Sequence, residues 1–353
     1  MFLPKPTQNS GTLLGNSYLS LWASCPRKWF YQYLYPHCEL GGEVVGRGLV
    51  PMDTAPALLR GSLWHNVMEH WLRSGVRDGV DTGERSMDQA LQIAEGLQAD
   101  RSQEYPDSRS REDDIESARA FFTQFDERFG PTGSSSLFPD VQVVCDETGE
   151  PYVEREFTYP LGVGDYVYTC RVDAIILHRS QYLEVMEHKT SAPSWVMRTL
   201  EGSHIRSQFA GEILTLRHNF GSDPDQEIHG CLVNVLVKGW NPKSKFPAPA
   251  VMDTTTRTPY QLEQFASRAA LYLRQIDDAV GEFNRLHGGG MDIESAAAQV
   301  FAQTGYHTDF CKAYNRDCDF RSLCELGHKP GALRGLAMRV KEGQQDEAMR
   351  NPE

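Results

Sequence analysis

The stretch that decides the fold is Tyr-Leu-Glu-Val-Met-Glu-His-Lys-Thr, residues 182–190, preceded by Arg-Val-Asp-Ala-Ile-Ile-Leu at 171–177. Both runs have the apolar pattern of buried strands, and residues 178–180 supply the turn between them. Alternate side chains of a strand share a face, so Glu187 and Lys189 point the same way and His188 points away. With the strands in register, Asp173 lies beside Glu187.

This constellation predicts a metal site. Asp173 and Glu187 can converge on one divalent cation, with the backbone carbonyl of His188 as a further ligand. Such oxygen ligands suit Mg2+ or Mn2+. Lys189 can then orient a water or stabilise developing charge. The alternative is that these are ordinary charges on edge strands, because short motifs recur by chance. A carboxylate inside an apolar run is costly unless it is bound, which favours the metal site.

Around this strand pair the sequence alternates between helical and extended patterns. Helices are predicted at 16–36, 58–74, 203–219 and 259–286, with an acidic helical segment at 86–129 that breaks at 105–106. Strands are predicted at 151–159, 165–177, 181–190 and 228–237, and a loop at 242–249. The expected fold class is a mixed α/β core flanked by helices. Expected domains are an N-terminal helical region at 1–57, a core at 58–290 with a helical insertion at about 78–129, a cysteine-rich module at 291–328 and a polar tail at 329–353.

Composition limits the function. The 353-residue chain has a formal net charge of −13, which argues against a broadly basic surface for nucleic acid. Much of the acidity lies at 78–127, so a local basic groove remains open. The chain has no apolar run of the roughly 18 residues that cross a bilayer, and its N-terminus lacks a signal-peptide pattern. A cytoplasmic location and no membrane partner are expected.

The cysteines predict a second metal-binding group. Cys311, Cys318 and Cys324 are clustered in a polar segment, and Cys25 lies far away in sequence. Four thiolates bind either zinc or an iron–sulfur cluster, but zinc ligands usually come as two close pairs. The one-plus-three split therefore favours a cluster over zinc. The alternative of buried, reduced thiols is accepted for the remaining cysteines, which are Cys38, Cys145, Cys170 and Cys231.

Asp173 followed by Glu187-His188-Lys189-Thr190 resembles the core of the PD-(D/E)XK nuclease superfamily, which implies a restriction-endonuclease-like fold. The helical motif Gly61-x3-His65-x3-Glu69, the strand at 152–157 and Gln208 resemble its RecB-type branch, in that order. Family members usually have tyrosine four residues after the glutamine, where this chain has Glu212. The resemblance implies the catalytic residues Asp173, Glu187, Lys189 and Gln208, and the metal ligands His65, Asp173, Glu187 and His188.

Three further carboxylates lie near these motifs. Glu69 is explained equally well as a site residue and as an ordinary carboxylate on the helix surface. Glu154 and Glu156 share one strand face if the alternation is regular. They are expected near the site or in salt bridges rather than as ligands.

The cysteines resemble the iron–sulfur nucleases of the same branch, which include CRISPR-associated exonucleases and helicase–nuclease subunits. In those proteins one cysteine precedes the core and three follow it, so that a 4Fe-4S cluster joins the two chain ends. The Cys25-Pro26 dipeptide and the Cys318-x5-Cys324 spacing match. The gap after Cys311 is longer than in many relatives and is similar to that of phage-type ones.

The expected function is that of a metal-dependent DNA nuclease, an exonuclease acting on single strands or duplex ends in recombination, repair or processing. The chain lacks a Walker motif, so a helicase, a single-strand annealing protein or a CRISPR-type partner could act beside it. Arg27 and Lys28 are candidate phosphate contacts. The neighbouring aromatic residues either stack on bases or pack in the core: Trp22, Trp29, Phe30 and Tyr31. Alternatives are a catalytically silent nucleic-acid-binding scaffold and a zinc-stapled protein of unrelated function.

Overall fold

The computed structural model describes most of the chain and divides it into two compact units. The described residues are 2–3, 12–38, 44–51, 56–105, 107–130, 141–221, 227–240, 243, 248–301, 312–313, 316–318, 320–326 and 338–340. Unit 1 consists of Met1–Asn9, Thr54–Tyr159 and Thr169–Glu263. Unit 2 consists of Ser10–Asp53, Pro160–Tyr168 and Gln264–Glu353.

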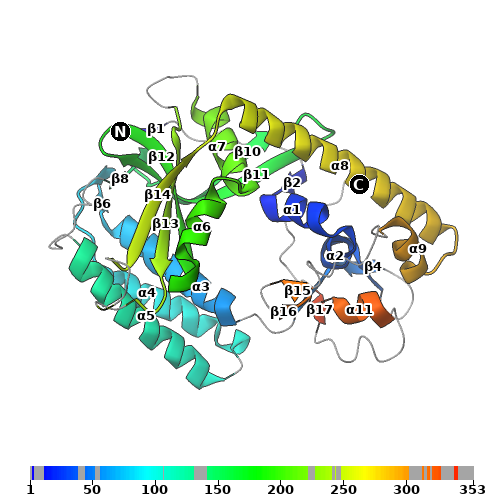
Figure 1. The fold of residues 1–353 in the computed structure, drawn as a ribbon, viewed down its shortest axis with the longest axis horizontal. Coiled ribbons are helices and arrows are strands. Elements are labelled where there is room, and N and C mark those ends of the chain that lie inside the picture. Colours follow the sequence, from blue (N-terminus) through cyan, green and yellow to red (C-terminus); the bar gives the residue numbers. More distant parts are fainter. Residues whose placement is uncertain are drawn as a thin grey trace. The chain divides into compact units, whose positions relative to one another are not determined.

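A mixed sheet forms the centre of unit 1 (Figure 1). Its strands lie in the order β10 (Val153–Pro160), β11 (Tyr166–His178), β12 (Tyr182–Ser191), β13 (Gly230–Val237) and β14 (Ala250–Thr256). β12 is antiparallel to β11 and parallel to β13, and β14 returns antiparallel to β13. A parallel pair needs a long crossover, which α6 (Val196–Ser203) and α7 (Ser207–Phe220) provide. The expected mixed α/β class is confirmed.

Three helices build the main core of unit 1. They are α3 (Pro56–Ser74), α4 (Met87–Asp100) and α5 (Ser108–Phe129), with a short 3-10 turn at Ser102–Glu104. Apolar residues of all three helices pack with the β12 and β13 side chains that alternate toward them, Met186, Leu232 and Leu236. Glu187 and Lys189 belong to the opposite alternation, toward α7. The short strands β8 (Val141–Val143), β1 (Phe2–Leu3), β9 (Cys145–Asp146), β6 (Val76–Arg77) and β7 (Val80–Asp81) complete the described part of this unit.

The structure corrects one expected helix and adds elements that the sequence did not predict. The helix expected at 16–36 is α1 (Asn16–Ser24), α2 (Pro26–Trp29) and a π-helical turn, η1 (Phe30–Leu34). The break falls at Cys25, which is extended because the residue before a proline avoids the helical region. The helix expected at 203–219 is α7, and α6 and β14 are among the elements that the sequence did not predict.

Unit 2 contains an aromatic core. Rings from α1, α2 and η1 pack with residues of α8 (Pro259–Gly288) and α9 (Ile293–Val300), including Phe283, and with Phe301, which directly follows α9. Phe30 stacks on Phe301 with ring centroids 4.8 Å apart. The other described elements of this unit are β2 (Thr12–Leu14), β3 (Pro36–Cys38), β4 (Val44–Arg47), β5 (Leu49–Pro51), β15 (Lys312–Ala313), β16 (Arg316–Asp317), α11 (Arg321–Leu326) and β17 (Met338–Val340).

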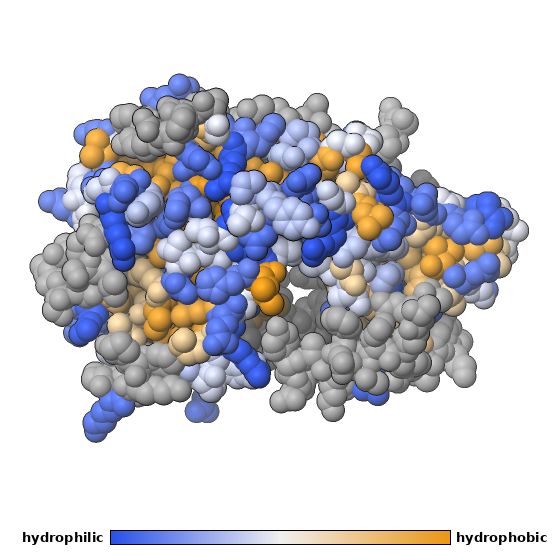
Figure 2. Space-filling view, turned by 45° about the horizontal axis from the view of Figure 1, so that its top comes forward, coloured by the Kyte–Doolittle hydropathy of each residue, from blue (hydrophilic) through white to orange (hydrophobic). Residues whose placement is uncertain are grey.

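The surface is polar where it can be seen. The face in Figure 2 is largely hydrophilic, with apolar residues gathered in small patches. Most large apolar side chains of the described segments are buried, as in any packed domain. Among the described helices, none combines the length and hydrophobicity needed to span a membrane.

Candidate active site

The site forms where β11 and β12 stop pairing. Their ladder runs from His178↔Tyr182 to Ala174↔Met186, although β12 continues to Ser191 beside β13. At the end of the ladder the backbone N–H of His188 donates to Asp173 Oδ2 at 2.6 Å. The carboxylate thus takes the hydrogen bond that the next ladder position would have supplied. The aspartate that the sequence singles out is therefore fixed by the end of strand pairing.

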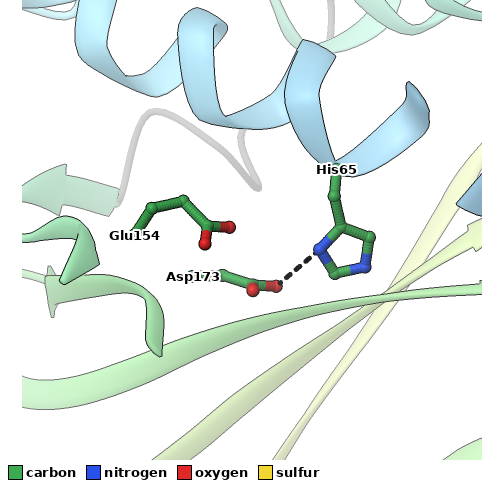
Figure 3. Close-up of side chains that lie close together, drawn as sticks. All are labelled: His65, Glu154 and Asp173. Carbon is green, nitrogen blue, oxygen red and sulfur yellow. Dashed lines mark ion pairs between the residues drawn. The ribbon is translucent and has the colours of Figure 1, made fainter. Parts of the chain in front are cut away.

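His65 of α3 and Glu154 of β10 converge on Asp173 (Figure 3). One ligand atom from each of these side chains lies within 4.8 Å of the other two. His65 Nδ1 is 3.4 Å from Asp173 Oδ2. Two carboxylate oxygens and an imidazole nitrogen are a donor set that divalent cations accept. The arrangement is a candidate metal centre.

Glu154 lies near the site and in a salt bridge, as the sequence predicts, but its place among the candidate ligands was not expected. Its backbone has φ +51°, a left-handed conformation that few non-glycine residues adopt. This left-handed residue interrupts the strand alternation, so the side chains of Glu154 and Glu156 have different partners. Glu154 turns toward His65 and Asp173 and also pairs with Arg171 at 3.0 Å, whereas Glu156 accepts a hydrogen bond from Thr169. No sequence pattern signals a left-handed glutamate, and only the backbone angle identifies it.

Glu187 lies in a second polar network, on the α7 side of β12. Its Oε1 accepts hydrogen bonds from Lys189 Nζ and from Gln208 Nε2, the latter at 2.8 Å. Gln208 Oε1 lies 3.4 Å from Lys189 Nζ, and Gln208 Nε2 also donates to Glu212 Oε1 at 2.7 Å. The glutamine therefore holds the acid and the lysine in one geometry, and Glu212, in the position of the family tyrosine, orients the glutamine.

Burial and mutual charge perturb these groups. Desolvation opposes the ionisation of Asp173, but the attraction of His65 holds its pKa at about 2. Desolvation, then Asp173, raises the pKa of Glu154 to about 7, and the same two causes raise that of Glu187. Desolvation lowers the pKa of Lys189, but Glu187 overcomes this and the net shift is upward. Closely spaced carboxylates that resist joint ionisation form a site that a cation would stabilise.

His188 contributes its backbone and a buried ring. Its side chain is 1% exposed, and its Nδ1 lies 2.9 Å from Asn234 Nδ2. Desolvation lowers its pKa to about 4, so the ring is neutral at neutral pH. The sequence expectations that the His188 carbonyl and the Glu187 carboxylate are metal ligands stay predictions. Glu69, the other carboxylate of the helical motif, accepts a hydrogen bond from Arg73 at 3.1 Å.

In unit 2, the side chain of Arg27, one of the two residues expected to touch DNA, is engaged internally. Arg27 pairs with Glu294 at 3.2 Å and donates to the Tyr31 hydroxyl, while the Lys28 backbone N–H donates to Cys25 Sγ. The neighbouring aromatic side chains belong to the buried core, the second of the two readings of this segment: Trp22, Trp29, Phe30 and Tyr31. DNA contact by Arg27 and Lys28 stays a prediction.

Three of the proposed cluster cysteines are described, and all are in unit 2. Cys25, Cys318 and Cys324 are each partly buried. Cys318 and Cys324 pack against the aromatic core that contains Trp22 and Trp29. Cys324 is also near enough to Arg27 to contribute to the rise of its pKa, behind the opposing effect of burial and the influence of Tyr31. Cys311 lies outside the described residues.

The fold and site define a class: a nuclease in which a mixed sheet presents acidic residues and a lysine. The family model of the PD-(D/E)XK nuclease superfamily matches residues 16–325, and the chain belongs to that superfamily. Among solved structures, LHK-Exo in complex with dAMP is similar with a TM-score of 0.30 and 9% sequence identity, over 67% of this chain and 97% of that one. No curated protein sequence matches.

Proposed function

We propose that this protein is a Mg2+- or Mn2+-dependent DNA nuclease, acting as an exonuclease on single strands or duplex ends. The observation that carries the proposal is the convergence of His65, Glu154 and Asp173 beside the Glu187–Lys189 pair. A catalytically silent scaffold would have no need to bury these carboxylates, because buried charges that are not used reduce stability.

The residues divide the chemistry between them. His65, Glu154 and Asp173 would hold the cation, which when bound polarises the scissile phosphate and acidifies a water. Glu187 lies next to this group and is 3% exposed, so its carboxylate is shielded from bulk water. Lys189 keeps its proton because Glu187 raises its pKa against the effect of burial, so it can donate to a phosphate oxygen or orient water. Gln208 holds the side chains of Lys189 and Glu187 in a fixed relative position.

The direct test is cleavage of labelled single-stranded and duplex DNA with Mg2+ or Mn2+. Wild type should degrade DNA, and Asp173→Ala and Lys189→Ala should not. Glu156→Gln is a matched control, because it removes a carboxylate from the strand of Glu154 outside the convergent group. Undiminished cleavage by Lys189→Ala would refute the assignment, and absence of cleavage by wild type with either metal would favour the silent scaffold. Shortening from the ends of a linear substrate, with a circular single strand left intact, distinguishes exonuclease action.

We also propose a 4Fe-4S cluster on Cys25, Cys311, Cys318 and Cys324. The proposal is supported by the partly buried thiols of the three described cysteines and by the contacts of Cys318 and Cys324 with one aromatic core. Such a cluster would join distant parts of the chain and restrict the unfolded state. Protein purified anaerobically should be brown, and Cys318→Ser should bleach and destabilise it. A colourless wild type that contains zinc would support the zinc-stapled alternative.

The biological setting follows from this activity and is part of the proposal. Recombination, repair or processing of DNA, including phage DNA, would use an end-directed nuclease. A helicase, a single-strand annealing protein or a CRISPR-type complex would present the strand to it, and the reaction would take place in the cytoplasm. Copurification of labelled DNA ends with the protein and such a partner would test this setting.

A further inference from the structure

An exposed indole lies just beyond the strand that carries Glu187 and Lys189. β12 ends at Ser191 and is followed by a 3-10 turn, η3 (Pro193–Trp195), and then by α6. Trp195 is 47% exposed, whereas Trp29, Trp64 and Trp71 are among the most fully buried side chains. Single exposed apolar residues are ordinary on protein surfaces, so exposure alone does not make Trp195 a binding residue.

The position of Trp195 is fixed by hydrogen bonds to the catalytic strand. The hydroxyls of Ser191 and Thr199 are 3.2 Å apart, and the Thr199 hydroxyl donates to the Trp195 carbonyl at 3.0 Å. The Trp195 N–H donates to the Ala192 carbonyl at 2.9 Å. Ser191 follows Lys189 by two residues and points to the same side of the strand. The first turn of α6 is therefore tied to the strand about 7 Å beyond the lysine position.

A positive charge lies against this indole in an otherwise acidic protein. The Arg198 guanidinium lies over the Trp195 ring, 4.8 Å from its centroid. Within the described segments, Arg198 forms no salt bridge, so its charge is available to a polyanion.

We propose that Trp195 is a stacking site for an unpaired base of single-stranded nucleic acid, and that Arg198 contacts an adjacent phosphate. An exposed aromatic ring beside a cation is the chemistry that binds single strands without sequence preference, because every base has a π face. A purely apolar protein partner would not require the cation. The inference rests on the proposed nuclease function and adds the route of the strand: past Lys189 and onto the first turn of α6.

The test measures binding in EDTA, where no cleavage occurs. Full-length wild type, Trp195→Ala and Trp195→Phe are titrated with a fluorescent single strand, with the same strand carrying abasic positions, and with a blunt duplex. Tyr260→Ala is the matched control. Tyr260 is also an exposed aromatic, but it follows β14 at Thr256, which pairs with Gly230 at the opposite end of the sheet from Ser191.

We expect Trp195→Ala to weaken binding of the normal single strand roughly tenfold, with little change for the abasic strand or the duplex, and Trp195→Phe to restore most of the loss. Arg198→Ala should reduce the dependence of binding on salt by about one phosphate contact. An equal loss on normal and abasic strands, an equal loss on the duplex, or no loss at all would overturn the stacking site. An equal loss in Tyr260→Ala would do the same.

The two proposals can fail separately. A wild type that binds single strands through Trp195 but never cleaves them with metal would refute the nuclease and leave the stacking site. If wild type and Trp195→Ala cleave DNA at the same rate and bind single strands with the same affinity, the stacking site is refuted and the nuclease proposal stands.

Discussion

The carboxylate site of unit 1 and the aromatic core of unit 2 use burial in opposite ways. In unit 1, Asp173 and Glu187 are 8% and 3% exposed, and burial raises the energy of their charged forms. In unit 2, Trp29 and Phe30 are buried among other rings, where burial and ring packing are both favourable. In unit 1 the buried carboxylate charges are unfavourable until a cation neutralises them. In unit 2 the packed rings stabilise the fold. Mutations at the carboxylate site should therefore mainly lower activity, and mutations in the aromatic core should mainly lower stability.

The largest effect should come from Lys189→Ala. Loss of a positive charge that contacts the reacting phosphate should lower cleavage by at least about a thousandfold. Stability should fall much less than activity, because Gln208 still donates to Glu187 and burial already raises the pKa of this carboxyl, so it can take up a proton when the lysine is lost. Cleavage rates and urea unfolding of the same preparation measure both quantities. If Lys189→Ala lost stability in proportion to its loss of activity, the contrast between the two regions would be contradicted.

Trp29→Ala should show the reverse behaviour. Removing a fully buried indole that packs against Tyr18, Trp22 and Phe301 leaves a cavity and should reduce the free energy of unfolding by about 4 kcal/mol. The change can be measured by urea denaturation followed by circular dichroism. The rate per folded molecule should stay within a few-fold of wild type in cleavage assays below the new transition. A small stability loss together with a large catalytic loss would contradict the division of roles.

His188 should make stability depend on pH. Because burial lowers its pKa to about 4, the unfolded chain binds a proton on His188 below about pH 6.5 that the native chain does not bind. Native stability should therefore fall as pH drops from 6.5 toward 4, by about 3 kcal/mol from this group. His188→Gln keeps an amide near Asn234 and cannot titrate. Its unfolding free energy, measured in EDTA, should decline less over this range, and an unchanged slope would show that His188 is protonated in the native state.

The smallest effect should come from Glu154→Gln, which removes one charged ligand candidate and leaves the other two. Metal affinity should fall about ten- to a hundredfold, and excess metal should recover part of the rate. Calorimetric titration with Mn2+ measures the affinity, with Glu156→Gln as the control. Equal affinities for the two variants would place Glu154 outside the metal centre and assign it to the Arg171 salt bridge alone.

Much of the core could be predicted because its signals are local. Strand alternation around Asp173 and Glu187 predicted β11 and β12, and the apolar stripe of Trp64, Val67 and Trp71 predicted α3. Signals that depend on the rest of the fold were missed. β14 is a strand because it covers the edge of β13, and its own sequence, Ala-Val-Met-Asp-Thr-Thr-Thr, has little alternation.

The sequence by itself determined the chemistry of the site: an aspartate and a Glu-x-Lys pair on adjacent strands, with a histidine on a preceding helix. Residue identity and parity are properties of a single strand, so they can be read along the chain. Only the tertiary structure decided that Glu154 also lies within 4.8 Å of His65 and Asp173, because that convergence depends on one left-handed backbone angle and on where a ladder ends. Both are set by packing between segments far apart in the chain.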